Sequence, residues 1–382
     1  MVNLSSIPGI YREEVFAKLE RQLLTGIPAF LGLASQGSVN QPQELTLWTQ
    51  FLQIFGPSLP NSYLYYAVRG FFSNGGTSCY IVRLDENLAP ETALLQGLES
   101  LAALDTVDLI CVPDLSYLSR TSDQSQQMQA AILDHCQQLG DRFAILDAWK
   151  DATVATVQQQ QQQLSEHPGA LNGALYFPWV QVENSPPELR IPPCGHIAGV
   201  YARSDRNTGV HQAPANFLLE DVLDLSVSLS HGEQMTLSSA SQAGSINYLR
   251  VLPGRGIRVW GSRTLSQSFD WQHINVRRLF LTVARWGDRH LADVAFEPNN
   301  FQLWVRIERE LTAFCESLFQ QGALQGATPS AAFYVTCNEE TNPPEIRALG
   351  QVVTEVGLAP TVPNEFIVVR LIHGSNGVTL SG

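Results

Sequence analysis

Short, continuously apolar segments alternate with segments of helical periodicity through the first two thirds of this 382-residue chain. The apolar segments cover residues 28–35, 79–84, 107–113, 143–147 and 174–180. The segments between them carry apolar residues at spacings of three and four, such as Leu94, Leu98 and Leu101. Short apolar strands separated by such helices form βαβ units, whose parallel sheets are covered on both faces. We therefore predict an α/β core with a mainly parallel sheet.

The pattern changes at about residue 250. Strands are predicted at residues 258–265, 332–337, 351–356 and 366–372, and helices at 276–286 and 301–318. Long helices followed by successive strands are typical of an α+β domain. We predict four regions, which are an N-terminal arm (1–22), an α/β core domain (23–249), a C-terminal α+β domain (250–363) and a C-terminal strand or arm (364–382).

Composition limits the classes of partner. The chain has 23 Lys and Arg against 36 Asp and Glu, a net charge of −13, which disfavours a nucleic-acid groove. Charged residues make up only 15%, so a surface this poor in charge predicts burial against further copies of the chain. No secretory signal and no membrane-spanning run is apparent in the sequence. The six scattered cysteines predict buried thiols in a protein assembled in the cytoplasm.

Three predicted strands end in an aspartate, at Asp85, Asp114 and Asp147. Ligands of open α/β sheets bind at the carboxyl ends of strands, and carboxylates there can hold Mg²⁺ or act as acid and base. Aspartate is also a common turn and helix-capping residue, which is the structural alternative. The sequence has no nucleophile elbow and no nucleotide-binding glycine motif. We predict no metal and no cofactor, and keep a cytoplasmic α/β hydrolase or Mg-dependent enzyme as the alternative function.

The two ends of the chain have strand-forming patterns. Residues 10–16 are β-prone, and residues 365–373 are apolar on both alternating faces. Terminal segments fray unless they are held by other parts of the structure. An apolar terminal strand also offers an unpaired edge with which another chain can pair. The C-terminal segment equally fits a strand of the protein's own sheet, and the sequence leaves both possibilities open.

Arginines gather in one part of the acidic chain. Residues 250–310 contain ten arginines against six acidic residues. On the predicted helix 276–286 and its continuation, Arg278, Arg285 and Arg289 fall on the side opposite to the apolar stripe. A solvated helix face explains such a ridge, and a docking strip for an acidic partner is the functional alternative.

Several stretches together resemble the tail sheath family of contractile phage tails and phage-tail-like injection systems. They are PGIYREEV (8–15), FLGLASQGSVNQPQELTLWTQFLQIFG (30–56), PPCGHIAGVYARSDRNTGVHQAPAN (192–216), LRVLPGRGIRVWGSRTL (249–265) and APTVPNEFIVVRLI (359–372). The resemblance implies a subtilisin-like core without a catalytic triad, and a structural protein rather than an enzyme. It also implies homo-oligomeric, six-membered rings stacked around an inner tube, which contract to drive the tube into a target.

The resemblance assigns roles to particular residues. Inter-subunit arms would include Ile10, Tyr11, Arg12, Glu13, Glu14, Val15, Phe366, Val368 and Arg370. The predicted tube-facing residues are Arg278, Arg285 and Arg289. Further partners implied are an inner tube protein, baseplate and terminal cap proteins, and room for a second sheath paralogue, with no nucleic acid and no direct membrane insertion. Whether the particle is released or membrane-anchored stays open.

Overall fold

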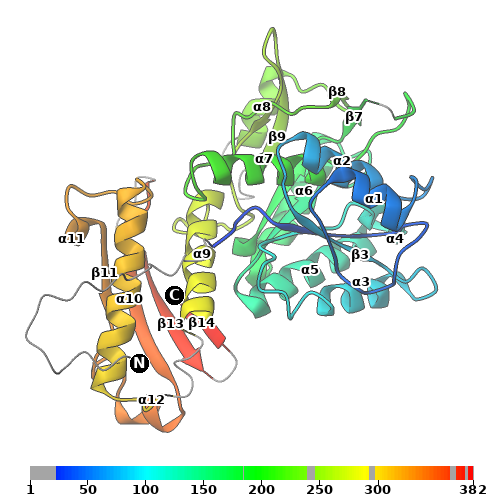
Figure 1. Ribbon diagram of the computed structural model, residues 1–382. Helices are drawn as coiled ribbons and strands as arrows, with labels where there is room; N and C mark the ends of the chain where they lie inside the picture. The colour runs from blue at the N-terminus through cyan, green and yellow to red at the C-terminus, as the bar shows by residue number, and fades with distance from the viewer. Residues whose placement is uncertain are drawn as a thin grey trace, which may run out of the picture.

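The computed structural model describes residues 23–183, 185–238, 246–291, 297–361, 367–374 and 377–381. Its largest element is an eight-stranded sheet (Figure 1). In spatial order the strands are β10 (Gly256–Trp260), β9 (Asn247–Leu252), β6 (Gly173–Phe177), β5 (Phe143–Asp147), β4 (Leu109–Cys111), β1 (Pro28–Gly32), β3 (Cys79–Arg83) and β2 (Gln43–Leu45). In this spatial order, every neighbouring pair between β9 and β3 is parallel. Only the two outermost strands, β2 and β10, pair antiparallel with their neighbours. The predicted parallel sheet is therefore confirmed.

Helices cover both faces of this sheet. One face packs against α1 (Trp48–Phe55), α2 (Leu64–Ser73) and α7 (Cys194–Asn207). The other packs against α3 (Pro90–Glu99), α5 (Ser122–Leu139), α6 (Val154–Ser165) and α8 (His231–Ser238). The parallel strands β1, β3, β4, β5 and β6 lie in the order β3-β1-β4-β5-β6. If these five are numbered along the chain, the order is 2-1-3-4-5, which is that of flavodoxin-like doubly wound sheets. Strands buried on both sides explain the unbroken apolar runs in the sequence.

Smaller elements connect the larger ones. They are the helices α4 (Leu115–Leu118) and η1 (Pro168–Asn172) and the two-stranded ladder of β7 (Val180–Val182) and β8 (Val222–Leu225).

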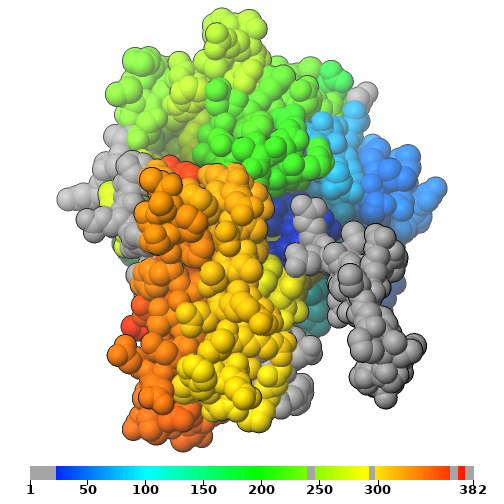
Figure 2. Space-filling model, turned by 60° about the vertical axis from the view of Figure 1, so that its left-hand side comes forward, coloured from blue at the N-terminus to red at the C-terminus, as the bar shows by residue number. Residues whose placement is uncertain are grey.

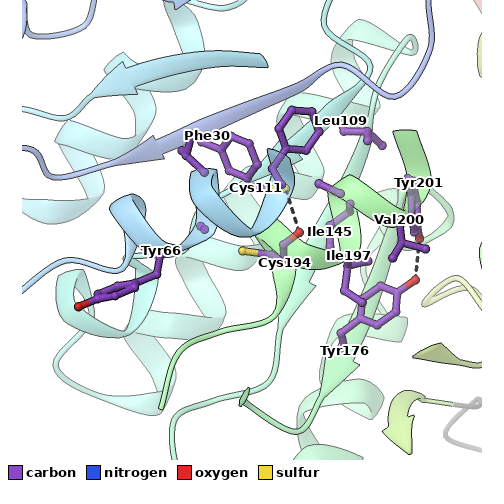
Figure 3. Close-up of a cluster of buried hydrophobic side chains, with 14 of the residues drawn as sticks. Phe30, Tyr66, Leu109, Cys111, Ile145, Tyr176, Cys194, Ile197, Val200 and Tyr201 are labelled. Carbon is purple, nitrogen blue, oxygen red and sulfur yellow. Dashed lines mark hydrogen bonds between the residues drawn. The ribbon is translucent and has the colours of Figure 1, made fainter. Parts of the chain in front are cut away.

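Helix α7 lies very close to α2 and to the sheet. A Cβ atom on Gly195 would lie 2.1 Å from the carbonyl oxygen of Ala67, and one on Gly199 would lie 2.5 Å from that of Phe71. Glycines four residues apart thus let the two helices approach closely. Figure 3 shows the sheet side of α7, where the hydroxyls of Tyr176 and Tyr201 are 2.7 Å apart. This packing fixes α7, which carries one of the acidic residues described below.

A second lobe contains a four-stranded antiparallel sheet and its own apolar core (Figures 1 and 2). Its strands are β11 (Phe333–Thr336), β12 (Val352–Leu358), β13 (Ile367–Gly374) and β14 (Gly377–Ser381), in that order. Its helices are α9 (Ile274–His290), α10 (Phe301–Gln320), α11 (Pro329–Ala332) and α12 (Pro344–Ala348). The apolar stripe of α10, including Trp304, Ile307 and Leu311, is buried in this core as its spacing predicts.

Helix α9 lies between the two lobes (Figure 1). Its residues Leu279 and Val283 belong to the core of the second lobe, whereas Ile274 and Leu281 belong to the core of the α/β body.

The boundary predicted at residue 250 falls inside β9, and both β9 and β10 are strands of the large sheet. The α/β layer therefore continues to Trp260.

Candidate functional site

The three strand-end aspartates lie in different surroundings. Asp85 is at the surface, where its Oδ1 atom accepts hydrogen bonds from the backbone and side chain of Asn87, which lower its pKa. Asp114 is fully buried and accepts from the backbone N–H of Leu33 at 2.6 Å and from the hydroxyl of Ser62 at 2.7 Å. Its carboxylate therefore holds the loop after β1 to the start of α2.

Asp147, at the end of β5, accepts a hydrogen bond of 2.9 Å from the backbone N–H of Cys194 at the start of α7. Burial raises the pKa of Asp147 to about 7 and that of Asp114 to about 6, although hydrogen bonds to the carboxylates act in the opposite direction. In the described ranges no three His, Cys, Asp or Glu residues group as metal ligands would. Asp114 and Asp147 thus connect backbone segments, Asp85 makes a local turn with Asn87, and the geometry does not support the alternative magnesium site.

The arginine face of α9 is where charges converge. Two of its arginines meet two aspartates of the α/β body in a buried group that we call the charge cluster. The charge cluster consists of Asp108, Asp205, Arg278 and Arg285. Asp108 immediately precedes β4, Asp205 lies on α7, and the two arginines lie two turns apart on α9.

Arg278 makes the strongest contacts of the charge cluster. Its two terminal nitrogens bind the two carboxylate oxygens of Asp205 at 2.9 and 2.6 Å, and Nη2 also binds Asp108 Oδ2 at 2.9 Å. Its guanidinium carbon lies 4.9 Å from the ring centre of Tyr201. Burial alone would lower the pKa of Arg278, but the two carboxylates raise it above its ordinary value. The side chain therefore stays charged, and the bidentate geometry fixes α9 against α7.

Arg285 is bound differently. Its Nη2 atom donates to three backbone carbonyls, those of Leu24, Asp105 and Thr106, at 3.1 to 3.3 Å. The nearest carboxylate contact is 3.9 Å long, from Nη1 to Asp108 Oδ2. Burial lowers the pKa of Arg285, and the carboxylate of Asp108 opposes this only in part.

The predicted exposed ridge is wrong for two of its three residues. Arg278 and Arg285 are each 3% exposed, because the face opposite to the apolar stripe is covered by the α/β body instead of water. Arg289, one turn further on, pairs with Asp105 at 3.0 Å and keeps 23% of its side chain exposed. A contact between Arg289 and a tube stays a prediction.

Sequence reasoning missed Asp108 and Asp205, the partners of these arginines. A signal was present for Asp108, which is a carboxylate inside the otherwise apolar segment VDLICVP, whereas Asp205 follows the polar residues Arg203 and Ser204. Buried acids of that kind need a cationic partner. Their combination with the arginines on the amphipathic helix could have indicated an internal contact.

The predicted arm residues divide between described and undescribed positions. Ile10, Tyr11, Arg12, Glu13, Glu14, Val15 and Phe366 lie outside the described residues. In β13, Val368 pairs with Gly357 and Arg370 with Glu355, and the strand is paired with β12 on one side and with β14 on the other. Within this chain the C-terminal segment is therefore a strand of the protein's own sheet, one of the two possibilities that the sequence left open.

Two simpler predictions can be checked directly. All six cysteines are free and buried, as predicted. Among the helices that the structure describes, none combines the length and apolarity that a bilayer crossing requires.

The region around the large sheet is similar in sequence to known proteins. Residues 92–265 match the family model of the phage tail sheath protein central domain. Over 180 residues, 44% of this chain, the sequence is 28% identical to the tail sheath protein of Salmonella phage ViI. This alignment spans about a quarter of that longer protein.

Solved structures match almost the whole chain. The sheath complex of the extracellular contractile injection system PVC, in its contracted state, matches with a TM-score of 0.73 and 28% identity over 96% of this chain and 97% of that one. The contracted helical sheath of the anti-feeding prophage matches with a TM-score of 0.74 and 28% identity over 95% and 98% of the two chains. A sheath tail protein from Listeria innocua shares the fold at 11% identity, with a TM-score of 0.66 over 91% and 94%.

Proposed function

Because this chain belongs to the phage tail sheath protein family, we propose that it is the contractile sheath subunit of a phage-tail-like injection particle. The observation that carries the proposal is the end-to-end match, with both lobes included, to two sheaths solved in the contracted state. The chain is a structural protein, and the strand-end aspartates have structural roles consistent with this.

The proposed assembly is a homo-oligomer of stacked six-membered rings around an inner tube, with a baseplate at one end and a terminal cap at the other. Support for the baseplate contact comes from a matching chain in the anti-feeding prophage baseplate, which aligns over 95% of this chain with a TM-score of 0.72. We propose assembly in the cytoplasm. A second sheath paralogue and a subtilisin-like relation of the core stay predictions.

Inter-subunit pairing through residues 10–15 stays part of the proposal. For the C-terminal strand the proposal is narrower. Its two edges are occupied by β12 and β14, so a neighbouring chain would have to pair at β14 or displace it. Conversion between extended and contracted states would then be a change of packing between subunits that each keep their own core.

Negative-stain electron microscopy of the purified protein tests this function. We expect hollow, transversely striated tubes with six-fold symmetric cross-sections, formed by the protein alone or after addition of its inner tube. A chain that stays a single 42.1 kDa particle at high concentration, with and without the tube, would contradict the proposal.

A further inference from the structure

The charge cluster also binds the beginning of the described chain. Residues 24–27, which we call the root, lead from the N-terminal segment into β1. Each of the four gives one polar group to the charge cluster. These groups are the carbonyl of Leu24 to Arg285 (3.2 Å), the side chain of Thr25 to Asp205, and the N–H groups of Gly26 and Ile27 to Asp108 (3.0 and 2.6 Å).

The backbone of the root is further fixed by close packing. Gly26 has a φ of +74°, and a Cβ atom there would lie 2.5 Å from the Cα atom of Ala202 on α7. Only glycine fits this conformation at this distance. Figure 2 shows the root, in dark blue, in the junction between the second lobe and the α/β body. The root is therefore held by α7, by α9 and by the residue that precedes β4.

Arg285 is hard to explain as a stabilising ion pair. It is buried, and among the residues that the structure describes it hydrogen-bonds only carbonyls, while its Nε and Nη1 atoms make no hydrogen bond. Burying a cation without a close carboxylate partner costs free energy, and hydrogen bonds to carbonyl groups offset this cost only in part. What the arrangement does achieve is geometric. One side chain of α9 joins the root to the loop before β4.

We propose that the charge cluster is an anchor that fixes where and in which direction the N-terminal segment leaves the subunit. The inference rests on the proposed function, in which that segment pairs with a neighbouring subunit. A force on the N-terminal segment would then act on α9 and on the large sheet together. Without the anchor, the same force would detach the root from its contacts with the α/β body. Asp108, Asp205 and Arg285 are thus positioning residues for the inter-subunit arm, which acts through the root.

The test uses the full chain and the variant Arg285→Met, which keeps the length of the side chain and removes its donors. Amide hydrogen exchange, followed by mass spectrometry, reports on residues 24–27. We expect exchange there to accelerate by at least about tenfold, while β5 and β6 keep their protection. Tube formation should be lost or strongly reduced. The matched control is Arg309→Met, which removes an exposed arginine of α10 that lies outside the charge cluster.

A second variant covers the case in which Arg285→Met does not fold. Thr25→Val removes only the hydroxyl that contacts Asp205, and we expect a smaller acceleration at residues 24–27 together with shorter or fewer tubes. Unchanged exchange in both folded variants would overturn the anchor. So would fast exchange in the root with normal tubes. If the unaltered protein forms no tubes, the proposed function fails, while the exchange measurement still decides whether the root is anchored.

Discussion

Asp108 and Arg278 are 170 positions apart in the chain, and the Nη2 atom of Arg278 lies 2.9 Å from the Oδ2 atom of Asp108. This contact joins a residue beside the large sheet to the helix that carries the core of the second lobe. Both side chains are less than a tenth exposed. Desolvated charges therefore join the two lobes, together with the apolar residues that α9 packs into both cores.

Removing the cation should be strongly destabilising. We expect Arg278→Met to lower the free energy of unfolding by about 3–5 kcal/mol, because Asp108 and Asp205 would be left buried without their partner. The control Arg289→Met breaks a more exposed pair and should cost at most about 1 kcal/mol. Urea unfolding followed by tryptophan fluorescence measures both. Equal, small losses would show that the charge cluster does not hold the lobes together.

Stability should depend on pH through Asp147. The folded protein keeps this proton up to a pH of about 7, whereas the unfolded chain releases it near the ordinary value of 3.8. Since the folded state binds more protons between these values, the free energy of unfolding falls as pH rises through that interval. Asp147→Asn removes this contribution and can still accept the hydrogen bond from Cys194.

The comparison is made by urea unfolding at pH 5 and pH 8. The variant should gain stability relative to the unaltered protein between the two pH values, by up to a few kcal/mol at about 1.36 kcal/mol per pKa unit. A constant difference between variant and parent at both pH values would mean that Asp147 ionises normally.

The close contact between α7 and α2 predicts a steric effect. Gly195→Ala places a methyl group 2.1 Å from the carbonyl oxygen of Ala67, so one helix must move, at a cost of roughly 1–3 kcal/mol. Gly232→Ala on α8 is the matched control, since a Cβ atom there meets nothing within 4 Å. Its helix propensity should make it neutral or slightly stabilising. Thermal unfolding of the two variants distinguishes crowding from a general effect of alanine.

Most strands of the α/β body could be predicted from the sequence, but most of the contacts between its elements could not. The apolar runs predicted β1, β3, β5 and β6 because strands buried on both faces carry no alternating pattern. Helical spacing also placed Arg278, Arg285 and Arg289 on one face of α9. It could not say what covers that face, because an aqueous surface and a layer carrying Asp108 and Asp205 select the same residue types. The partner of β13 was undetermined for a similar reason, since a two-faced apolar strand pairs equally well within or between chains.

Deleting Met1–Arg21 should leave the fold intact and prevent sheath formation. The deletion ends before the root, so Leu24–Ile27 keep their contacts with the charge cluster. We expect a monomer with nearly unchanged thermal unfolding, because the deletion keeps every residue of the three described cores. Electron microscopy and size-exclusion chromatography measure the outcome. Long tubes formed by the truncated protein would rule out the N-terminal segment as the inter-subunit arm.

Arg289 is the remaining candidate for a tube contact on α9. Its side chain is 23% exposed, and its partner Asp105 is 69% exposed, so the pair can open to an acidic group on another protein. One exposed pair is worth at most about 1 kcal/mol, but a stack of rings repeats it many times. We expect Arg289→Glu to slow sheath growth on the inner tube, and growth of the unaltered protein to weaken as salt rises. Arg309→Glu, an exposed arginine on α10, changes the net charge equally and serves as the control. If the two variants assemble alike on the tube, α9 does not face it at Arg289, and the sheath must contact the tube through another surface.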